Sequence, residues 1–195
     1  MTDLGYCDGS SQPNGSITTY TGKSINLFSP HPDEVCMADI VAALPHRNRY
    51  NGQTIWPYSV CTHSCTIFDY VYQVDPAPTL NKLAWALMHD ATEAYLPDIP
   101  RPYKHAIPIF GEHEDRLMAV IAEKYHMTPE CPDIVKYADK HIGRREAYEL
   151  FPTPPAWVED YDDIGTDVPR WDVDESRRQF HKRLQAVFGP DVLTK

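Results

Sequence analysis

Three side chains that could do chemistry lie close together in the stretch LAWALMHDATEAYLP. His89 and Asp90 are adjacent, and Glu93 follows one helical turn after them. On a helix the three can converge on one side, because positions three and four apart share a face. Burying such groups costs free energy unless each one finds a partner. We therefore predict that His89 and Asp90 bind a metal ion and that Glu93 is a nearby acid or base.

Further metal ligands must come from other segments, because two ligands leave a divalent ion undersatisfied. The best candidates are His63 in YSVCTHS, on an otherwise apolar helix face, and Asp139 in VKYADKHIG. Taken alone, His63 could be a hydrogen-bonded core histidine, and Asp139 could be a solvated surface charge. Cys61 and Cys65 flank His63, but no second cluster of Cys and His completes a zinc finger.

The order of these blocks resembles the HD-domain metal-dependent phosphohydrolases, whose signature is a His, then a His-Asp pair, then a distant Asp. Here the pieces read YSVCTHS, ALMHDATEAYLPDIPRPYK and VKYADKHIGRREAYEL. The lead-in from TYTGK to RYNGQT also resembles the phage and bacterial branch that acts on deoxynucleotides, so the resemblance covers residues 18 to 151. It implies one divalent ion held by His63, His89, Asp90 and Asp139.

Two carboxylates remain once the metal is satisfied. Glu93 and Asp98, the latter in LPDIPRP, could each serve as general acid or base. The plainer interpretation is a helix-face salt bridge for Glu93 and a turn cap for Asp98. Two imidazoles and two carboxylates suit zinc, cobalt, manganese or iron, so the ligands alone do not choose the ion. We expect zinc, cobalt or manganese, with magnesium on the substrate phosphates as a further cation.

The resemblance also nominates residues for substrate binding. NRY at positions 48 to 50 is similar to an Asn-Arg-aromatic element that lies beside the nucleotide in these enzymes. It implies that Arg49 contacts phosphate or sugar and that Tyr50 contacts the base or sugar. Lys104 would meet phosphate charge. Arg47 adjoins the same element, so which arginine reaches the substrate stays open.

Two kinds of relative define the expected activity. One is the bacterial 5′-deoxynucleotidases that act on deoxynucleoside monophosphates, and the other is the dATP triphosphohydrolases of phages whose genomes carry 2-aminoadenine. The length and lead-in are closer to the second, which implies release of deoxyadenosine and triphosphate from dATP. A non-catalytic HD module that senses a nucleotide is the alternative from another class. A di-iron HD oxygenase would need further histidines, and the surroundings of His105 and His113 do not resemble that motif.

Hydrophobic periodicity predicts an all-α fold, in this case an HD-domain helical bundle. Apolar residues recur at helical spacing within residues 30–44, 58–74, 79–95, 112–127, 132–151 and 174–189. Ser59 is the predicted N-cap of the second helix, and Gly189 is the predicted C-cap of the last. Pro97 and Pro100 should end the third helix and leave DIPRPYK as a stiff ledge beside the site.

Two segments are expected to lack helical periodicity. The N-terminal segment is irregular, with a short β-like part around SITTYTGKSINLF. A long Pro-rich acidic loop, residues 152–172, precedes the last helix, and Trp157 and Trp171 predict that it packs against the domain.

The composition excludes several classes of protein. The 195 residues, 42% of them hydrophobic, fit a single HD phosphohydrolase domain spanning 1–195. A formal charge of −10 argues against nucleic-acid and anionic-membrane partners. Because the sequence shows neither a long apolar run nor a signal peptide, we expect a cytoplasmic protein, in the host cytoplasm if phage-encoded, with reduced cysteines. Relatives commonly self-associate, so a homo-oligomer is also expected.

Overall fold

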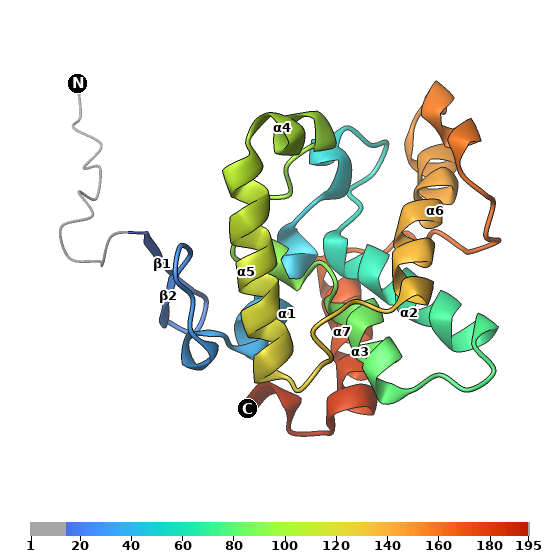
Figure 1. Cartoon of the computed structure of the whole chain (residues 1–195). Helices are drawn as coiled ribbons and strands as arrows, with labels where there is room; N and C mark the ends of the chain where they lie inside the picture. Colours follow the sequence, from blue (N-terminus) through green and yellow to red (C-terminus); the bar gives the residue numbers. More distant parts are fainter. Residues whose placement is uncertain (1–14, 195) are drawn as a thin grey trace.

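Helices make up most of the chain, and they build the layer that holds the predicted ligands (Figure 1). The computed structural model describes residues 15–194; residues 1–14, part of the expected irregular segment, lie outside the described residues. Over the described residues the all-α prediction is confirmed. The α-helices are α1 Met37–Ala43, α2 Val60–Val74, α3 Leu80–Met88, α4 Arg101–Ala106, α5 Pro108–Lys124, α6 Asp133–Leu150 and α7 Val173–Phe188.

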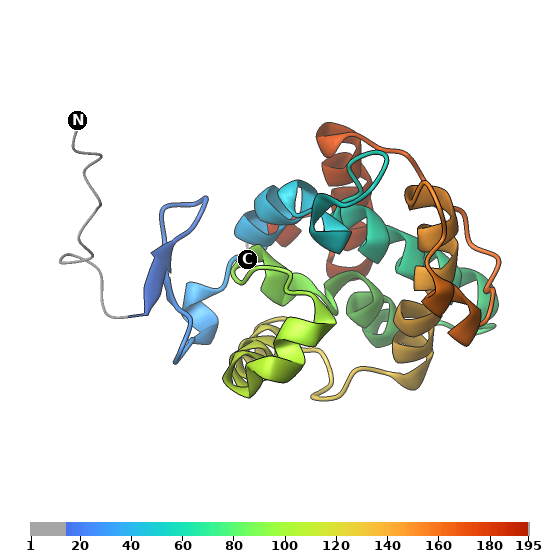
Figure 2. The same cartoon turned by 90° about the horizontal axis from the view of Figure 1, so that it is seen from above.

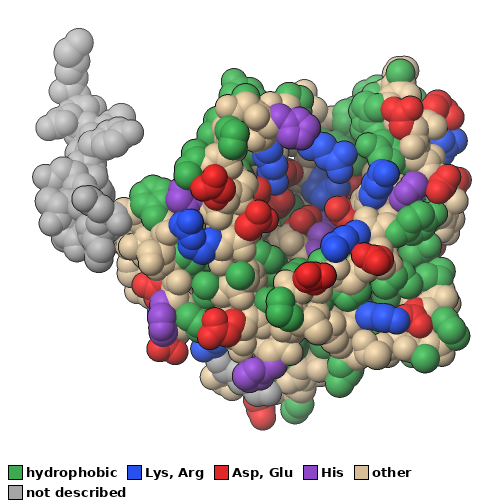
Figure 3. Space-filling view, viewed as in Figure 1, with side chains coloured by type: hydrophobic (Ala, Val, Ile, Leu, Met, Phe, Trp, Pro, Cys, Tyr) green, Lys and Arg blue, Asp and Glu red, His purple; other side chains and the backbone are tan. Residues whose placement is uncertain are grey.

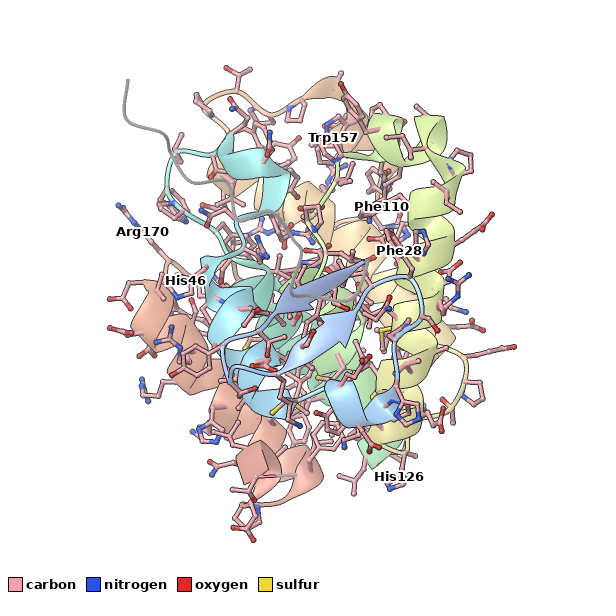
Figure 4. The ribbon with its side chains drawn as sticks, turned by 90° about the vertical axis from the view of Figure 1, so that its left-hand side faces the viewer. Phe28, His46, Phe110, His126, Trp157 and Arg170 are labelled. Atoms are coloured by element: carbon pink, nitrogen blue, oxygen red, sulfur yellow. The ribbon has the colours of Figure 1, made fainter. Side chains whose placement is uncertain are left out.

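The remaining elements are short. Strands β1 Ser16–Thr18 and β2 Ser24–Asn26 pair antiparallel, which confirms the predicted β-like start. Figure 2 shows this hairpin at one edge of the molecule. In Figure 4 the hairpin lies across α1 and α5, and the Phe28 ring centroid is 5.0 Å from that of His113 on α5. The 3-10 helices are η1 Pro32–Glu34, η2 Leu44–His46, η3 Arg49–Gly52, η4 Ala91–Ala94, η5 Ala156–Asp160 and η6 Val192–Thr194.

Helix α2 lies at the centre of the bundle and packs against α3, α6 and α7. Its residues Val60, Ile67 and Val71 are fully buried, as are Phe180 and Leu184 of α7. In Figure 1, α5 and α6 stand on either side of these central helices. The apolar face of α2 thus fixes His63, on the same helix, inside the bundle. No helix within residues 15–194 combines the length and apolar character needed to cross a membrane.

The start of α2 is closed by the predicted N-cap. Ser59 Oγ accepts a hydrogen bond from the Thr62 backbone N–H at 3.1 Å and lies 2.9 Å from Thr62 Oγ1. Both side chains are buried. A serine at this position satisfies one of the N–H groups that a helix leaves unpaired at its start.

Ser59→Ala should therefore lower the free energy of unfolding by about 0.5–2 kcal/mol, or roughly 2–4 °C of melting temperature per kcal/mol. Thr79→Ala is the matched control, because Thr79 caps α3 in the same way, by accepting from the Lys82 N–H at 3.3 Å, but is exposed. Thermal unfolding should show the larger loss at Ser59, and equal losses would contradict a special role for the buried cap.

The third helix ends earlier than predicted. α3 stops at Met88, so His89 is its C-cap, and Asp90 leaves the helix with φ −105° and ψ 18°. Glu93 lies in η4 rather than on the same continuous helix. The expectation of one helix to Tyr95 was wrong. His89 Nδ1 pairs with the Ala86 carbonyl of the last turn, and the Asp90 carboxylate turns toward the cluster described below.

Proline positions explain two further differences. The chain after Pro100 forms α4 instead of a stiff ledge, because proline is tolerated in the first turn of a helix. α5 begins at Pro108, four residues before the predicted start at residue 112, for the same reason. The predicted helix over residues 30–44 is interrupted, since η1 begins with a capping box at His31 and ends at Val35, which is extended before α1 begins.

The loop of residues 152–172 is held against α6. Arg144 Nη1 donates to the carbonyls of Val158 and Tyr161, each at 3.0 Å, and Arg145 Nε donates to the Thr166 carbonyl at 3.2 Å. The prediction that the loop packs down is confirmed at Trp171, which packs against the core, whereas Trp157 is 38% exposed.

Candidate metal centre

The four predicted ligands come together from three helices. His63 comes from α2, His89 and Asp90 from the end of α3, and Asp139 from α6. One potential ligand atom from each lies within 4.8 Å of the other three. Segments 76 residues apart in the sequence therefore meet at one point.

The spacing of these atoms suits a small divalent ion. His63 Nε2 lies 3.1 Å from Asp139 Oδ1 and 3.2 Å from His89 Nε2. His89 Nε2 lies 3.3 Å from Asp90 Oδ2. Bonds of 2.0–2.1 Å to a tetrahedral ion place the ligand atoms about 3.3 Å apart. Two other pairs are wider, with His63 Nε2 3.7 Å from Asp90 Oδ2 and His89 Nε2 3.9 Å from Asp139 Oδ1, and the four residues are close enough to hold a divalent metal ion.

The hydrogen bonds on the far side of each imidazole orient it toward this point. His63 Nδ1 is 2.6 Å from Glu146 Oε1, and His89 Nδ1 is 3.1 Å from the Ala86 carbonyl oxygen. With the Nδ1–H of each ring donated to these acceptors, the Nε2 lone pairs are the ones that can bind a metal ion. Two imidazoles and two carboxylates then converge on one point, which favours a cation there.

The pKa values of His89 and Asp90 show that the cluster favours positive charge on the imidazoles and negative charge on the carboxylates. Burial lowers the pKa of His89, but the Asp90 carboxylate outweighs burial and raises it to about 9. Burial raises the pKa of Asp90, but His89, His63 and Arg49 together hold it well below its usual range. Without a metal ion, a proton on the imidazoles supplies the missing charge.

Glu146 completes the centre and was missed in the sequence. It is fully buried, and besides His63 it accepts from Tyr50 Oη at 2.7 Å and from Arg49 Nε at 3.2 Å. Burial raises its pKa, but Arg49 and His63 outweigh this effect and lower it to about 2. The available signal was its position seven residues after Asp139, since two helical turns bring both to one face of α6.

Glu146→Gln should weaken metal binding by about 10–100-fold, because an amide cannot hold the His63 Nδ1–H as a carboxylate does. Titration of the apo protein with Zn²⁺ against a competing chelator measures this affinity. Glu149→Gln, an exposed position on the same helix, is the control and should bind as the wild type does. Unchanged affinity in Glu146→Gln would show that the contact does not support His63.

The two nominated η3 residues lie against the ligands. Arg49 Nη1 is 3.4 Å from Asp90 Oδ2, while Arg47 Nε donates to the Glu93 carbonyl at 3.1 Å. Arg49 is thus the arginine whose charge faces the cluster. Tyr50 has a left-handed backbone with φ 55°, a strained conformation for a tyrosine that persists only where its surroundings require it.

Glu93 is the buried acid that the sequence predicted. It is 5% exposed, and its Oε2 has no hydrogen-bond partner among the described residues. Burial, followed by the charges of Asp90 and Asp98, raises its pKa to about 9. Asp98 itself is half-buried. Glu93 therefore carries a proton at neutral pH in the metal-free protein.

Lys104 lies at the edge of the centre, where its charge acts on both Glu93 and Asp90. Its Nζ donates to Glu114 Oε1 at 2.8 Å, so it is paired with a carboxylate of α5. Glu114 is a second residue that the sequence analysis missed. The pair is about half withdrawn from water, and it fixes Lys104 close to the acids.

Comparison with known proteins gives a family but no activity. No family model matches the chain. The chain is 37% identical over 135 residues to the uncharacterized protein YfdR of Escherichia coli. The aligned region covers 69% of this chain and 71% of YfdR. The chain belongs to the YfdR family. An uncharacterized protein of Rhodobacter capsulatus is 32% identical over 137 residues, or 67% of this chain and 70% of that protein.

The surface of this YfdR-family protein has a hollow near the middle of the face seen in Figure 3. Figure 3 shows a hollow with Lys and Arg gathered on its upper rim and Asp and Glu within it. Positive and negative side chains are thus separated within this hollow. Since neither relative is characterized, the chemistry of the family rests on this geometry.

Proposed function

We propose that this protein is an HD-domain metal-dependent phosphohydrolase that acts on deoxynucleotides, with dATP as the substrate and deoxyadenosine and triphosphate as the products. One observation carries the proposal. Four atoms that can bind one metal ion lie beside Glu93, a buried carboxyl with a pKa of about 9. The order of His63, the His-Asp pair and Asp139 along the chain, which resembles HD phosphohydrolases, supports the same assignment.

The ligand set fits zinc, cobalt or manganese, and it comprises two neutral imidazoles and two carboxylates. When bound, such an ion polarises a phosphoryl oxygen and lowers the pKa of a water molecule. The protein itself supplies the proton that the leaving group needs. Glu93, protonated at neutral pH, can donate to the 5′-oxygen of the leaving nucleoside.

The remaining nominated residues act by charge. Arg49 faces Asp90 with a guanidinium held by Glu146, so it is oriented before substrate arrives. Lys104, fixed by Glu114, offers a second positive charge near the same acids. Burial and then the charges of Asp90 and Asp98 raise the pKa of Glu93, so Asp98 helps to keep the proton on the general acid. Magnesium would accompany the outer phosphates of a triphosphate substrate.

Product analysis tests the proposal. Protein loaded in turn with Zn²⁺, Co²⁺ and Mn²⁺ is incubated separately with dATP, the other deoxynucleoside triphosphates and dAMP, and the products are separated by chromatography with phosphate detection. Deoxyadenosine and triphosphate, formed preferentially from dATP, is the expected result. Turnover of dAMP alone would replace it with a 5′-deoxynucleotidase. No turnover with any of the metals would overturn hydrolysis and leave a nucleotide-sensing module to test.

A further inference from the structure

A cavity of about 470 Å³ opens beside the metal centre, between α3, α5 and α6. It reaches three of the four ligands, His89, Asp90 and Asp139. Its volume falls in the range of cavities that bind small organic ligands. The function argued above uses the residues around the metal but assigns nothing to this space.

The cavity has an apolar part beside its charged groups. Trp85 comes from α3, Met118 from α5 and Val135 from α6. Cys131 adds a thiol whose pKa is raised by burial to about 11, so it is neutral at physiological pH and behaves as a small apolar group. These walls suit a flat, uncharged ring system.

The charges of the cavity disfavour a polyphosphate. Asp115 of α5 lines the cavity together with Asp90 and Asp139, and no arginine of the described residues lines it. Lys136 is its one lysine among those residues, and it is already near Asp133, with Nζ 3.8 Å from Oδ1. Two of the three carboxylates are the ligands Asp90 and Asp139, so a triphosphate placed beyond the metal would meet Asp115 and one partly engaged cation, Lys136.

The opposite side of the metal centre has the reverse character. Arg49 and Lys104 face the acids there, and Arg101 Nη1 lies 3.3 Å from the Tyr161 hydroxyl. The last contact joins α4 to the loop of residues 152–172. Positive charge is therefore gathered on one side of the ligands and apolar surface on the other.

We infer that the cavity binds the nucleoside half of the substrate, with its base between Met118 and Val135, and that the phosphate chain points the other way, toward Arg49 and Lys104. Asp115 offers an acceptor for an amino group on the base. The class of substrate rests on the proposed phosphohydrolase function. The division of the site into an apolar and a basic half rests on the cavity and the charges alone.

The test separates the two halves of the substrate by measuring each as a ligand. Calorimetry measures deoxyadenosine binding to the metal-free protein and tripolyphosphate binding to the Mn²⁺-loaded protein. Ala119→Phe fills the cavity from an exposed position of α5 that lines it. Ala77→Phe, the same substitution at an exposed position between α2 and α3 that does not line the cavity, is the control. Lys104→Gln removes charge from the opposite side.

Ala119→Phe should weaken deoxyadenosine binding at least about tenfold and leave tripolyphosphate binding within about twofold, while Ala77→Phe changes neither. Lys104→Gln should do the opposite. Wild-type protein that does not bind deoxyadenosine, or an Ala119→Phe protein that binds it normally, would overturn the inference. A further outcome is that the wild type binds deoxyadenosine and loses this binding in Ala119→Phe, yet hydrolyses no nucleotide. That result would uphold the cavity assignment and reject the proposed function.

Discussion

His89→Ala is expected to abolish stoichiometric metal binding and all turnover. The variant removes one of four converging ligands and leaves Asp90 and Asp139 without the imidazole charge that now lies 3.3 Å and 3.9 Å from them. Loss of an outer partner of a metal ligand costs about 10–100-fold in affinity, so loss of a ligand itself should cost more than about 100-fold. Elemental analysis after dialysis, with product assays on the same sample, measures both effects.

His105→Ala is the matched control for this experiment. His105 is an exposed histidine on α4 that does not belong to the cluster, and it lies in the same interval between the His-Asp pair and Asp139. Its replacement should leave one ion bound per chain. A His89→Ala protein that still bound one ion per chain would remove His89 from the ligand set, and loss of metal in His105→Ala would indicate a different site.

Local signals made part of the fold predictable. Ser59 caps the start of α2 and Gly189 caps the end of α7, each through contacts with nearby residues in the chain. Residue type alone therefore predicts both caps. The apolar periodicity of α7 is strong because it packs against the bundle on one face, whereas the first half of α2 is buried on all sides. Elements of this kind are encoded within a short window of sequence.

The boundary after α3 could not be predicted in this way. His89 and Asp90 continue a helical pattern in the sequence, yet the helix ends at Met88 because both side chains are engaged by the cluster. α4 is a second such case, since its first turn contains Pro102, and proline is read more readily as a breaker than as a first-turn residue. The first boundary coincides with tertiary contacts of the two side chains, and the second follows from the position of a proline.

Some residues of the candidate site were likewise predictable from the sequence and others were not. The four ligands were predicted because chemistry requires His and Asp in a recognisable order. Glu146 and Glu114 were not, because each supports a site residue, His63 or Lys104, from a different helix. A glutamate on an amphipathic helix is usually a solvated charge. Its burial becomes visible only when the helices are packed together.

Glu93→Gln should lower kcat by about 10²–10⁴-fold while the protein retains its metal. Glutamine keeps the shape and neutrality of the protonated side chain but has no proton to donate to the leaving oxygen. Steady-state assays with dATP, alongside metal analysis, measure the two properties. Glu112→Gln, an exposed position on α5, is the control and should be as active as the wild type. Normal kcat in Glu93→Gln would remove Glu93 from the chemistry.

The same variant should stabilise the metal-free protein as pH rises. The pKa of Glu93 is about 9 in the folded protein against an ordinary value of 4.5, so between these values the folded state binds one proton more than the unfolded state. Folding stability then falls with rising pH, by at most about 1.4 kcal/mol per pH unit from this group. Glu93→Gln has no such proton to lose. Denaturant unfolding from pH 5 to pH 9 should therefore show a stability gain that widens with pH, and a constant difference would mean that Glu93 ionises normally.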